Sequence, residues 1–301
     1  MSLQHQDHAS TTDTSRRTDG IDPFFVFDYV PLDGPDDRPP DPGDEPDQSS
    51  GQRMTTYWDV EKGCRGPDPR PDWVVTDAGA VDTELGVLKT GKEADVFLLE
   101  RAAPDGTASV YAAKRYRSPE HRTFHRSAAY TTGRRVKRSR DTRALERKSA
   151  HGRAIAAGQW AMAEWDALCR YWTVGLPVPY PVQVDGSEIL MEFIAYDGQA
   201  APRLSQVRPD TDLLAEYFHQ IRTVISVMAA EGWAHGDLSA YNILAAGDRL
   251  VVIDLPQVVD LVSNPEGADF LMRDCRNVCS WFQARGLDVD SQELFAEVTP
   301  T

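Results

Sequence analysis

The sequence lacks any apolar run long enough to span a membrane, and its N-terminus lacks the apolar segment of a signal peptide. Its four cysteines, Cys64, Cys169, Cys275 and Cys279, do not have the spacing of a disulfide framework. Cys275 and Cys279 lie one helical turn apart, but no second pair of metal ligands accompanies them. We therefore predict a cytoplasmic protein with free thiols, without membrane association and without a structural zinc site.

Aliphatic residues are scarce in residues 1–71, which are rich in Asp, Pro, Gly, Ser and Thr. Such a segment cannot bury enough apolar surface to offset the entropy lost on folding, so we expect a disordered, acidic, Pro-rich extension. One apolar run, 23–27, interrupts it and is a docking peptide, a strand that pairs with a partner, or an unstructured apolar patch. From about Trp73 the composition is that of a globular chain, and hydrophobic residues, 41% of the whole sequence, suffice for a sizeable core.

Positive charge is in deficit overall, since 32 Lys and Arg residues face 47 Asp and Glu residues, for a formal net charge of −15. That balance argues against general nucleic-acid binding, because like charges repel. The average hides a basic segment, 115–153, which carries 13 Arg or Lys residues against three acidic ones and has few aliphatic residues. We expect a flexible insertion there. Three roles stay open for it: a solvated loop, a partner for the acidic extension, or a contact with RNA phosphates.

Residues 234–244 read Ala-His-Gly-Asp-Leu-Ser-Ala-Tyr-Asn-Ile-Leu and predict a polar turn between two apolar strands. The turn carries Asp237 and Asn242, and the next apolar run ends at Asp254. Phosphoryl transfer needs such a set, in which one carboxylate orients the attacking hydroxyl while an amide oxygen and a second carboxylate hold metal ions. Asp and Asn are also ordinary turn formers, so the interpretation depends on their spacing, on His235 and on the position of Asp254.

A Walker A motif is absent, but residues 85–99 predict a strand, a Gly-containing turn and a second strand. In that turn Gly91 would let the backbone approach phosphates closely, and Thr90 and Lys92 would add polar contacts. Many hairpins contain glycine, so this turn alone is weak support for a nucleotide site.

A third predicted strand, 109–114, places Lys114 on the same face as small apolar residues. An ammonium group in such surroundings needs an anion, and nucleotide phosphates would serve. The helix predicted over 159–173 has an apolar stripe with Glu164 beside it, where its carboxylate can turn inward to pair with Lys114. Solvent-exposed positions for both residues are the alternative.

Four further elements follow along the chain. A hairpin is predicted over 182–194 across Asp185-Gly186, and its second strand leads onward as a hinge that offers backbone groups to an adenine. Helices are predicted over 212–231 and 265–286, and a last short helix begins at Asp290.

As an ordered set, these motifs closely resemble the RIO family of atypical serine/threonine protein kinases, over about residues 73–301. The matching residues are Thr90-Gly91-Lys92-Glu93-Ala94-Asp95-Val96, Ala113-Lys114, Trp160 to Glu164, Met191-Glu192-Phe193-Ile194, His235 to Asn242, and Ile253-Asp254-Leu255-Pro256-Gln257. The resemblance implies an α+β, two-lobed protein-kinase-like fold. Residues 72–194 would form the N-lobe, and 195–301 a truncated C-lobe that lacks an activation loop and substrate-docking helices. The sequence supports this expectation, because the 47 residues of 255–301 hold no Ala-Pro-Glu motif and are too few for both features.

The resemblance also implies roles for individual residues. Asp237 would orient the nucleophile, Asn242 and Asp254 would bind the metal, and Lys114, paired with Glu164, would hold the α- and β-phosphates. The other implied nucleotide contacts are Thr90, Gly91, Lys92, Glu93, Val96, Ala112, Met191, Glu192 and Ile194. The implied cofactors are ATP and Mg²⁺, with Mn²⁺ as the alternative metal.

In this family Asp254 is further implied as a phosphate acceptor, which would give an aspartyl-phosphate and an ATPase cycle. A protein substrate is expected, and the basic insertion would contact rRNA or a ribosomal particle during maturation of the small ribosomal subunit. Two other functions are compatible with the motifs. One is a small-molecule phosphotransferase of the aminoglycoside or choline type, and the other is a nucleotide-binding scaffold or switch on an RNA–protein particle.

Overall fold

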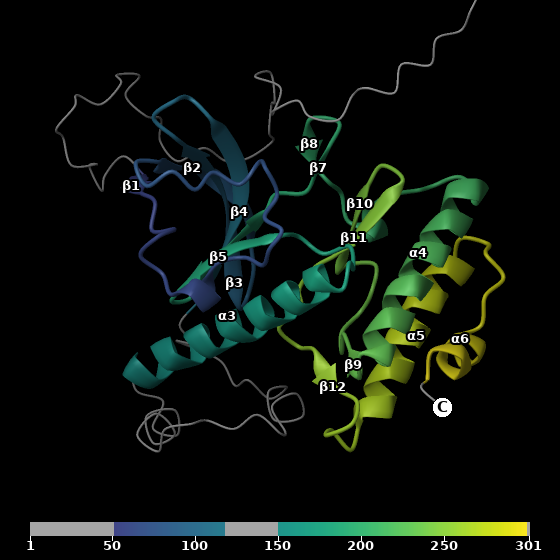
Figure 1. The fold of residues 1–301 in the computed structure, drawn as a ribbon. Coiled ribbons are helices and arrows are strands. Elements are labelled where there is room, and N and C mark those ends of the chain that lie inside the picture. The colour runs from purple at the N-terminus through teal and green to yellow at the C-terminus, as the bar shows by residue number, and fades with distance from the viewer. Residues whose placement is uncertain (1–50, 118–149, 300–301) are drawn as a thin grey trace, which may run out of the picture.

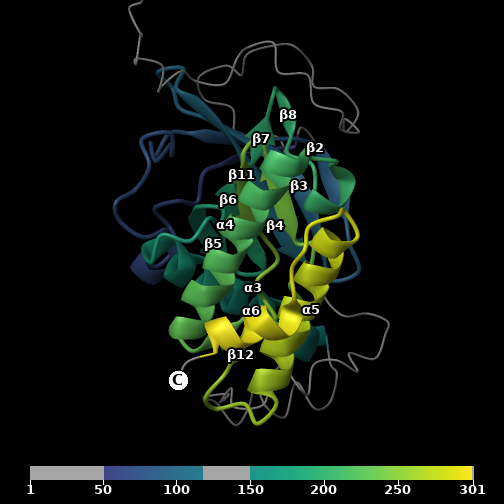
Figure 2. The ribbon, with the colours of Figure 1, turned by 90° about the vertical axis from the view of Figure 1, so that its right-hand side faces the viewer.

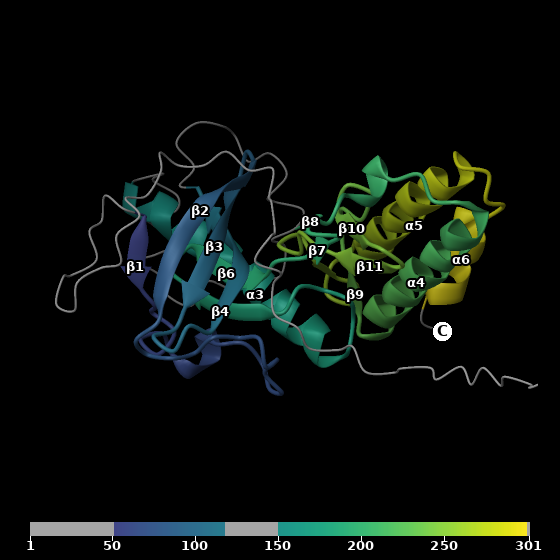
Figure 3. The ribbon, with the colours of Figure 1, turned by 90° about the horizontal axis from the view of Figure 1, so that it is seen from above.

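A computed structural model of the chain describes residues 51–117 and 150–299 (Figure 1). Strands dominate up to residue 192, and helices dominate after residue 210. Seen from above, the large sheet and helices α4 to α6 lie at opposite ends, with helix α3 running between them (Figure 3). The α+β, two-lobed architecture predicted from the sequence is therefore confirmed.

The N-lobe is a six-stranded antiparallel sheet in the order β1-β2-β3-β4-β6-β5. Its strands are β1 (Gln52–Met54), β2 (Val81–Thr90), β3 (Ala94–Ala102), β4 (Ala108–Tyr116), β5 (Pro181–Asp185) and β6 (Glu188–Glu192). Helix α3 (Ala150–Thr173) begins earlier than the helix predicted over 159–173, and both end at residue 173. It packs on one face of the sheet and continues toward the C-lobe (Figure 1).

Both faces of the sheet pack against a hydrophobic cluster. Successive side chains of a strand point to opposite sides, so alternate residues of one strand belong to different clusters. On β4, Ala112 and Tyr116 pack with α3, whereas Tyr111 and Ala113 pack in a second cluster. That second cluster includes Tyr57 and other residues from the N-terminal side of β2. An almost continuous apolar run in β4 is therefore required by the fold.

Residues 51–76, here called the N-terminal strap, wrap around the N-lobe. The strap contains β1 and the 3-10 turn η1 (Lys62–Cys64). The Gly66 N–H donates to the Val182 carbonyl at 3.0 Å, and the Trp165 indole donates to the Gly63 carbonyl at 3.0 Å. The expectation that residues 1–71 are disordered is thus wrong for 51–71, because a short strand, a buried tyrosine and backbone hydrogen bonds hold them in place. Residues 1–50 lie outside the described part of the chain.

The C-lobe contains three main helices, α4 (Thr211–Ala230), α5 (Gly267–Gln283) and α6 (Ser291–Val298), which lie together in Figure 2. Asp210 caps α4 by accepting the Leu213 N–H, and Asp290 caps α6 as predicted. Short strand pairs connect the helices: β7 (Ala195–Tyr196) with β8 (Gln199–Ala200), β9 (Trp233–Ala234) with β12 (Val259–Asp260), and β10 (Ile243–Ala246) with β11 (Arg249–Val252). The turn η2 (Leu204–Gln206) precedes α4.

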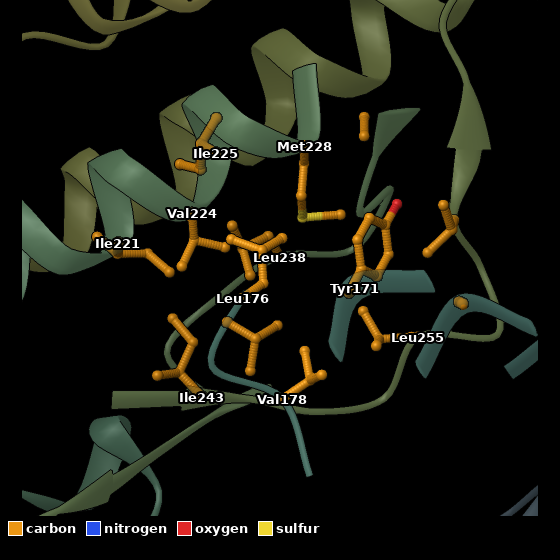
Figure 4. Packing of buried hydrophobic residues seen from close by; sticks show 14 of the residues in the cluster. Tyr171, Leu176, Val178, Ile221, Val224, Ile225, Met228, Leu238, Ile243 and Leu255 are labelled. Carbon is orange, nitrogen blue, oxygen red and sulfur yellow. The ribbon is translucent and has the colours of Figure 1, made fainter. Parts of the chain in front are cut away.

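One core joins the two lobes (Figure 4). Tyr171 at the end of α3 packs near Met228 of α4, and Leu238 and Leu255 reach the same cluster from the turns that carry Asp237 and Asp254. Burial of these two leucines anchors both turns, since each fully buried leucine contributes about 2 kcal/mol or more.

Between Asp254 and residue 299, the structure contains β12, α5 and α6, which agrees with the truncated C-lobe expected from the sequence. Most of the predicted basic insertion, 118–149, lies outside the described residues, whereas its ends belong to β4 and α3. Across 51–117 and 150–299, no helix combines the length and apolar character needed to cross a bilayer.

The strap offers a matched pair of glycine substitutions. A Cβ on Gly66 would lie 2.0 Å from the Pro181 carbonyl oxygen, whereas a Cβ on Gly63 would meet nothing within 4 Å. We expect Gly66→Ala to lower the free energy of unfolding by about 1–3 kcal/mol, because the strap must shift. Gly63→Ala should change it by less than about 0.5 kcal/mol. Chemical denaturation of both variants measures this, and equal stabilities would contradict the close packing of the strap.

Candidate active site

The turn between β9 and β10 brings Asp237 and Asn242 together. The Asn242 side-chain amide donates to the Asp237 carbonyl at 2.8 Å, and the Ile253 N–H donates to the Asn242 carbonyl at 3.0 Å. Buried His235 places Nε2 3.1 Å from the Ile253 carbonyl, while its Nδ1 accepts the Asp237 N–H at 3.4 Å. A carbonyl can only accept, so the ring proton is on Nε2. These contacts tie the turn to the segment that ends at Asp254.

Asp274 on α5 forms hydrogen bonds to the backbone of the same turn. Its two carboxylate oxygens accept the Gly236 and Leu238 N–H groups, each at 2.8 Å, and the Asp274 residue is only 1% exposed. Burial raises the pKa of Asp274, opposed by His235 and by these two N–H donors. Asn277, one turn further along α5, donates to the Leu238 carbonyl at 3.1 Å. The turn therefore has its shape fixed by the helix beneath it.

Lys114 connects the two lobes electrostatically. Its Nζ lies 2.7 Å from the Glu164 carboxylate on α3 and 2.9 Å from Asp254 Oδ1. Burial acts to lower the pKa of Lys114, but Glu164, Tyr116 and Asp254 raise it well above its usual value of 10.5. Lys114 in turn is the main cause that lowers the pKa of Asp254 below 3.8. Lys114 and Asp254 are thus both charged near neutral pH.

Glu164 is 2% exposed and accepts hydrogen bonds from three residues on two other segments. Besides Lys114, the Tyr116 hydroxyl donates to Oε2, and the Leu255 N–H donates to Oε1 at 3.3 Å. A buried carboxylate requires such pairing, because unpaired charge in the interior is costly. The carboxylate consequently joins α3, β4 and the segment that follows Asp254.

Asp254 has φ of 67°, in the left-handed region that non-glycine residues rarely adopt. Its side chain keeps 46% exposure although it contacts Lys114. Strained backbone of this kind persists where the surroundings fix it, often at functional sites. The strained backbone thus places the Asp254 carboxylate where it contacts both Lys114 and solvent.

The other predicted nucleotide contacts lie on the same face of the sheet as Lys114 or in the β2–β3 turn. Val96 is directly opposite Lys114 across β3 and β4, and Ala112 is directly opposite Met191 across β4 and β6. The turn itself carries Gly91, Lys92 and Glu93 after Thr90 ends β2, with Thr90, Lys92 and Glu93 exposed. A Cβ on Gly91 would come within 2.6 Å of the Ala94 carbonyl, so the tight turn requires glycine.

The segment after β6 has its own hydrogen bonds. The Glu192 N–H donates to the Tyr180 carbonyl at 2.8 Å, and the Ile194 carbonyl accepts the Ala201 N–H at 2.9 Å. The Glu192 carboxylate accepts the Tyr180 N–H at 3.0 Å, and burial raises its pKa. The Glu192 side chain therefore fixes the path of the chain between the lobes.

Sequence reasoning missed three residues near the site. Lys89 lies opposite Val96 and hence in the same cross-strand row as Lys114. Its pKa is lowered, first by burial and second by the positive charge of Arg203. Tyr116 could have been found from period-2 spacing, because it is two residues after Lys114. Asp274 had no local signal beyond its place in an apolar helical stripe, where an acid is unexpected.

The fold and the site define a two-lobed, protein-kinase-like phosphotransferase. The sequence profile of the RIO domain matches residues 104–294, more than half of the chain. The chain belongs to the RIO family of serine/threonine protein kinases, as the motifs predicted.

Known relatives support this assignment. The chain is 34% identical over 221 residues to the RIO-type serine/threonine-protein kinase Rio1 of Haloferax volcanii, covering 73% of this chain and 70% of the relative. It is 29% identical over 235 residues to mouse serine/threonine-protein kinase RIO3, but spans only 44% of that protein. Among solved structures, the Chaetomium thermophilum Rio2 kinase in an ADP/Mg²⁺-phosphoaspartate complex is similar, with 22% identity, a TM-score of 0.50, and coverage of 71% of this chain and 60% of that one. That likeness supports the fold.

The ion pairs of Lys114 predict a pH-dependent stability. The raised pKa of Lys114 stabilises the fold below about pH 10.5, and the effect is lost as pH rises through the folded value. The lowered pKa of Asp254 stabilises the fold above about pH 3.8, and the effect is lost as pH falls through the folded value. The full contribution is thus present between these limits.

Lys114→Met should therefore lower the free energy of unfolding by about 3–5 kcal/mol near neutral pH, because Glu164 keeps a buried, uncompensated charge. The difference from the wild type should be constant between about pH 5 and 9 and shrink below 3.8. Urea unfolding across this range measures it, with exposed Lys62→Met as the control that changes little. A difference that does not depend on pH would contradict the ion-pair account.

Proposed function

We propose that this chain is an ATP-dependent RIO-type serine/threonine kinase that also hydrolyses ATP. The observation that carries the proposal is the meeting of Lys114, Glu164 and Asp254 next to the turn of Asp237 and Asn242. Phosphoryl transfer depends on positioning and on charge neutralisation, and these residues supply both. In this proposal the N-lobe extends from the N-terminal strap to residue 194, and the C-lobe begins at residue 195.

ATP would lie against the sheet face that carries Lys114. Lys114 holds the α- and β-phosphates, and the turn of Thr90, Gly91, Lys92 and Glu93 covers them. Val96, Ala112 and Met191 form the apolar surface over the adenine. The Glu192 carbonyl and the Ile194 N–H pair with the adenine edge, since the Glu192 N–H and the Ile194 carbonyl already have partners within the protein.

Asn242 and Asp254 would bind Mg²⁺. An amide oxygen and a carboxylate are hard oxygen ligands, and Mg²⁺ commonly takes one or two protein ligands together with substrate phosphates. The Asn242 amide nitrogen donates to the Asp237 carbonyl, which leaves the side-chain oxygen for the metal. The ion would neutralise charge that develops on the phosphates.

We further propose that Asp254 accepts the γ-phosphoryl group. A carboxylate oxygen attacks the γ-phosphorus, the bond to the bridging oxygen breaks, and ADP leaves; water then hydrolyses the acyl phosphate and releases phosphate. The 46% exposure of the Asp254 side chain and its neighbour Lys114 suit this role. The Chaetomium relative, whose structure is described as a phosphoaspartate complex, supports the same chemistry.

The physiological acceptor would be a protein or a ribosomal particle in maturation of the small subunit, contacted through the basic segment 118–149, which lies outside the described residues. Membership of the RIO family of serine/threonine protein kinases favours this over a small-molecule phosphotransferase. A scaffold that uses slow ATP hydrolysis as a timing signal would need the same residues.

Labelling with γ-³²P-ATP and Mg²⁺ tests the proposal. The wild type should release phosphate and retain a base-labile, hydroxylamine-sensitive label that Asp254→Asn abolishes. Asp237→Ala should reduce turnover by about 10²–10⁴-fold while ATP binding persists. Asp248→Asn, an exposed change in the β10–β11 turn, is the control and should leave turnover unchanged. Full turnover by Asp237→Ala would refute its role, and acid-stable label on Ser or Thr would place the transfer on hydroxyl groups instead.

A further inference from the structure

Tyr116 contacts the centre of the proposed site and is itself buried. It follows Lys114 by two residues on β4, so both side chains lie on the same face of the sheet. Its hydroxyl donates to Glu164 Oε2, and the Leu255 N–H donates to Oε1, while Lys114 Nζ lies 2.7 Å from each of the two oxygens. Tyr116 is therefore the neutral donor that Oε2 has beside the Lys114 ammonium.

The burial of this pair makes the hydroxyl important. Tyr116 is 6% exposed and Glu164 is 2% exposed, so removing the hydroxyl would leave Oε2 in the interior with Lys114 as its remaining donor. Burial is the largest cause that raises the pKa of Tyr116 well above 10, and the charge of Glu164 is the second. The phenol therefore stays protonated and can donate. Its ring also lies 5.3 Å from Lys114 Nζ, within the range of a cation–π contact.

We propose that Tyr116 is a positioning residue that keeps Glu164, and through it Lys114, in the phosphate-binding arrangement before nucleotide arrives. The inference rests on the proposed role of Lys114. Tyr116 and the Leu255 N–H fix the carboxylate from the strand side and from the segment after Asp254. The site is thus assembled within the fold, without help from an activation loop.

The strand offers a matched control. Tyr111 is also a buried tyrosine of β4, but it lies on the opposite face, where its hydroxyl accepts the Val75 N–H at 2.9 Å. Tyr111→Phe and Tyr116→Phe each remove one buried hydroxyl from the same strand. Any general effect of such a loss on folding should appear in both variants.

The test is steady-state ATP turnover. Tyr116→Phe should lower kcat about tenfold, with less than about a threefold change in the KM for ATP, because the transition state depends most on the position of Lys114. Tyr111→Phe should keep the wild-type kcat. A wild-type kcat for Tyr116→Phe, or equal losses in the two variants, would overturn the proposal.

A double mutant shows whether Tyr116 acts through Glu164. Glu164→Gln should lower kcat, and adding Tyr116→Phe to it should cause little further loss, because the carboxylate that Tyr116 positions is gone. Fully additive losses would overturn the proposal. Absence of turnover in the wild type, or turnover retained in Asp237→Ala, would instead count against the proposed function, so the two failures are distinguishable.

Discussion

A carboxylate buried between two lobes must have hydrogen-bond donors, and Glu164 accepts hydrogen bonds from two other segments of the chain. Helix α3 carries the acid, β4 provides Lys114 and Tyr116, and the segment after Asp254 provides a backbone N–H. Because an unpaired buried charge costs several kcal/mol, displacement of any of these segments is opposed by the other two. The same contacts place Lys114 beside Asp254, so the requirement for pairing also builds the arrangement that we propose to bind phosphates.

The catalytic turn depends on a second buried acid. Asp274 accepts two N–H groups of the turn that carries Asp237, and Leu238 anchors this turn in the shared core, as Leu255 anchors the turn of Asp254 (Figure 4). Asp237 is thus held through its backbone N–H and carbonyl, which suits the catalytic role that we propose for its carboxylate. A left-handed Asp254 is tolerated for the same reason, since its neighbours on both sides are anchored.

Much of this arrangement could be predicted from the sequence. Period-2 spacing placed Lys114 on the correct face of its strand, and the Asp237–Asn242 spacing with the apolar run before Asp254 predicted their assembly. Helical periodicity left two positions open for the Glu164 side chain, paired with Lys114 or exposed to solvent. Periodicity does not say which flank of the helix a neighbouring strand occupies.

The missed features all depend on tertiary contacts. The strap has a polar, Pro-rich composition and looks disordered, but a few buried residues such as Tyr57 and a close approach at Gly66 are sufficient to hold it. Asp274 and Tyr116 contact partners 36 to 48 residues away in the chain, and although period-2 spacing puts Tyr116 on the face of Lys114, no local pattern reveals those partners.

A crystal structure with a non-hydrolysable ATP analogue and Mg²⁺ would test the central claim most directly. The account predicts that the phosphates lie between Lys114 and the Asn242–Asp254 pair, that the adenine edge meets Glu192 and Ile194, and that Glu164 keeps its contact with Lys114. Nucleotide bound elsewhere, or Lys114 separated from Glu164 in the complex, would contradict it.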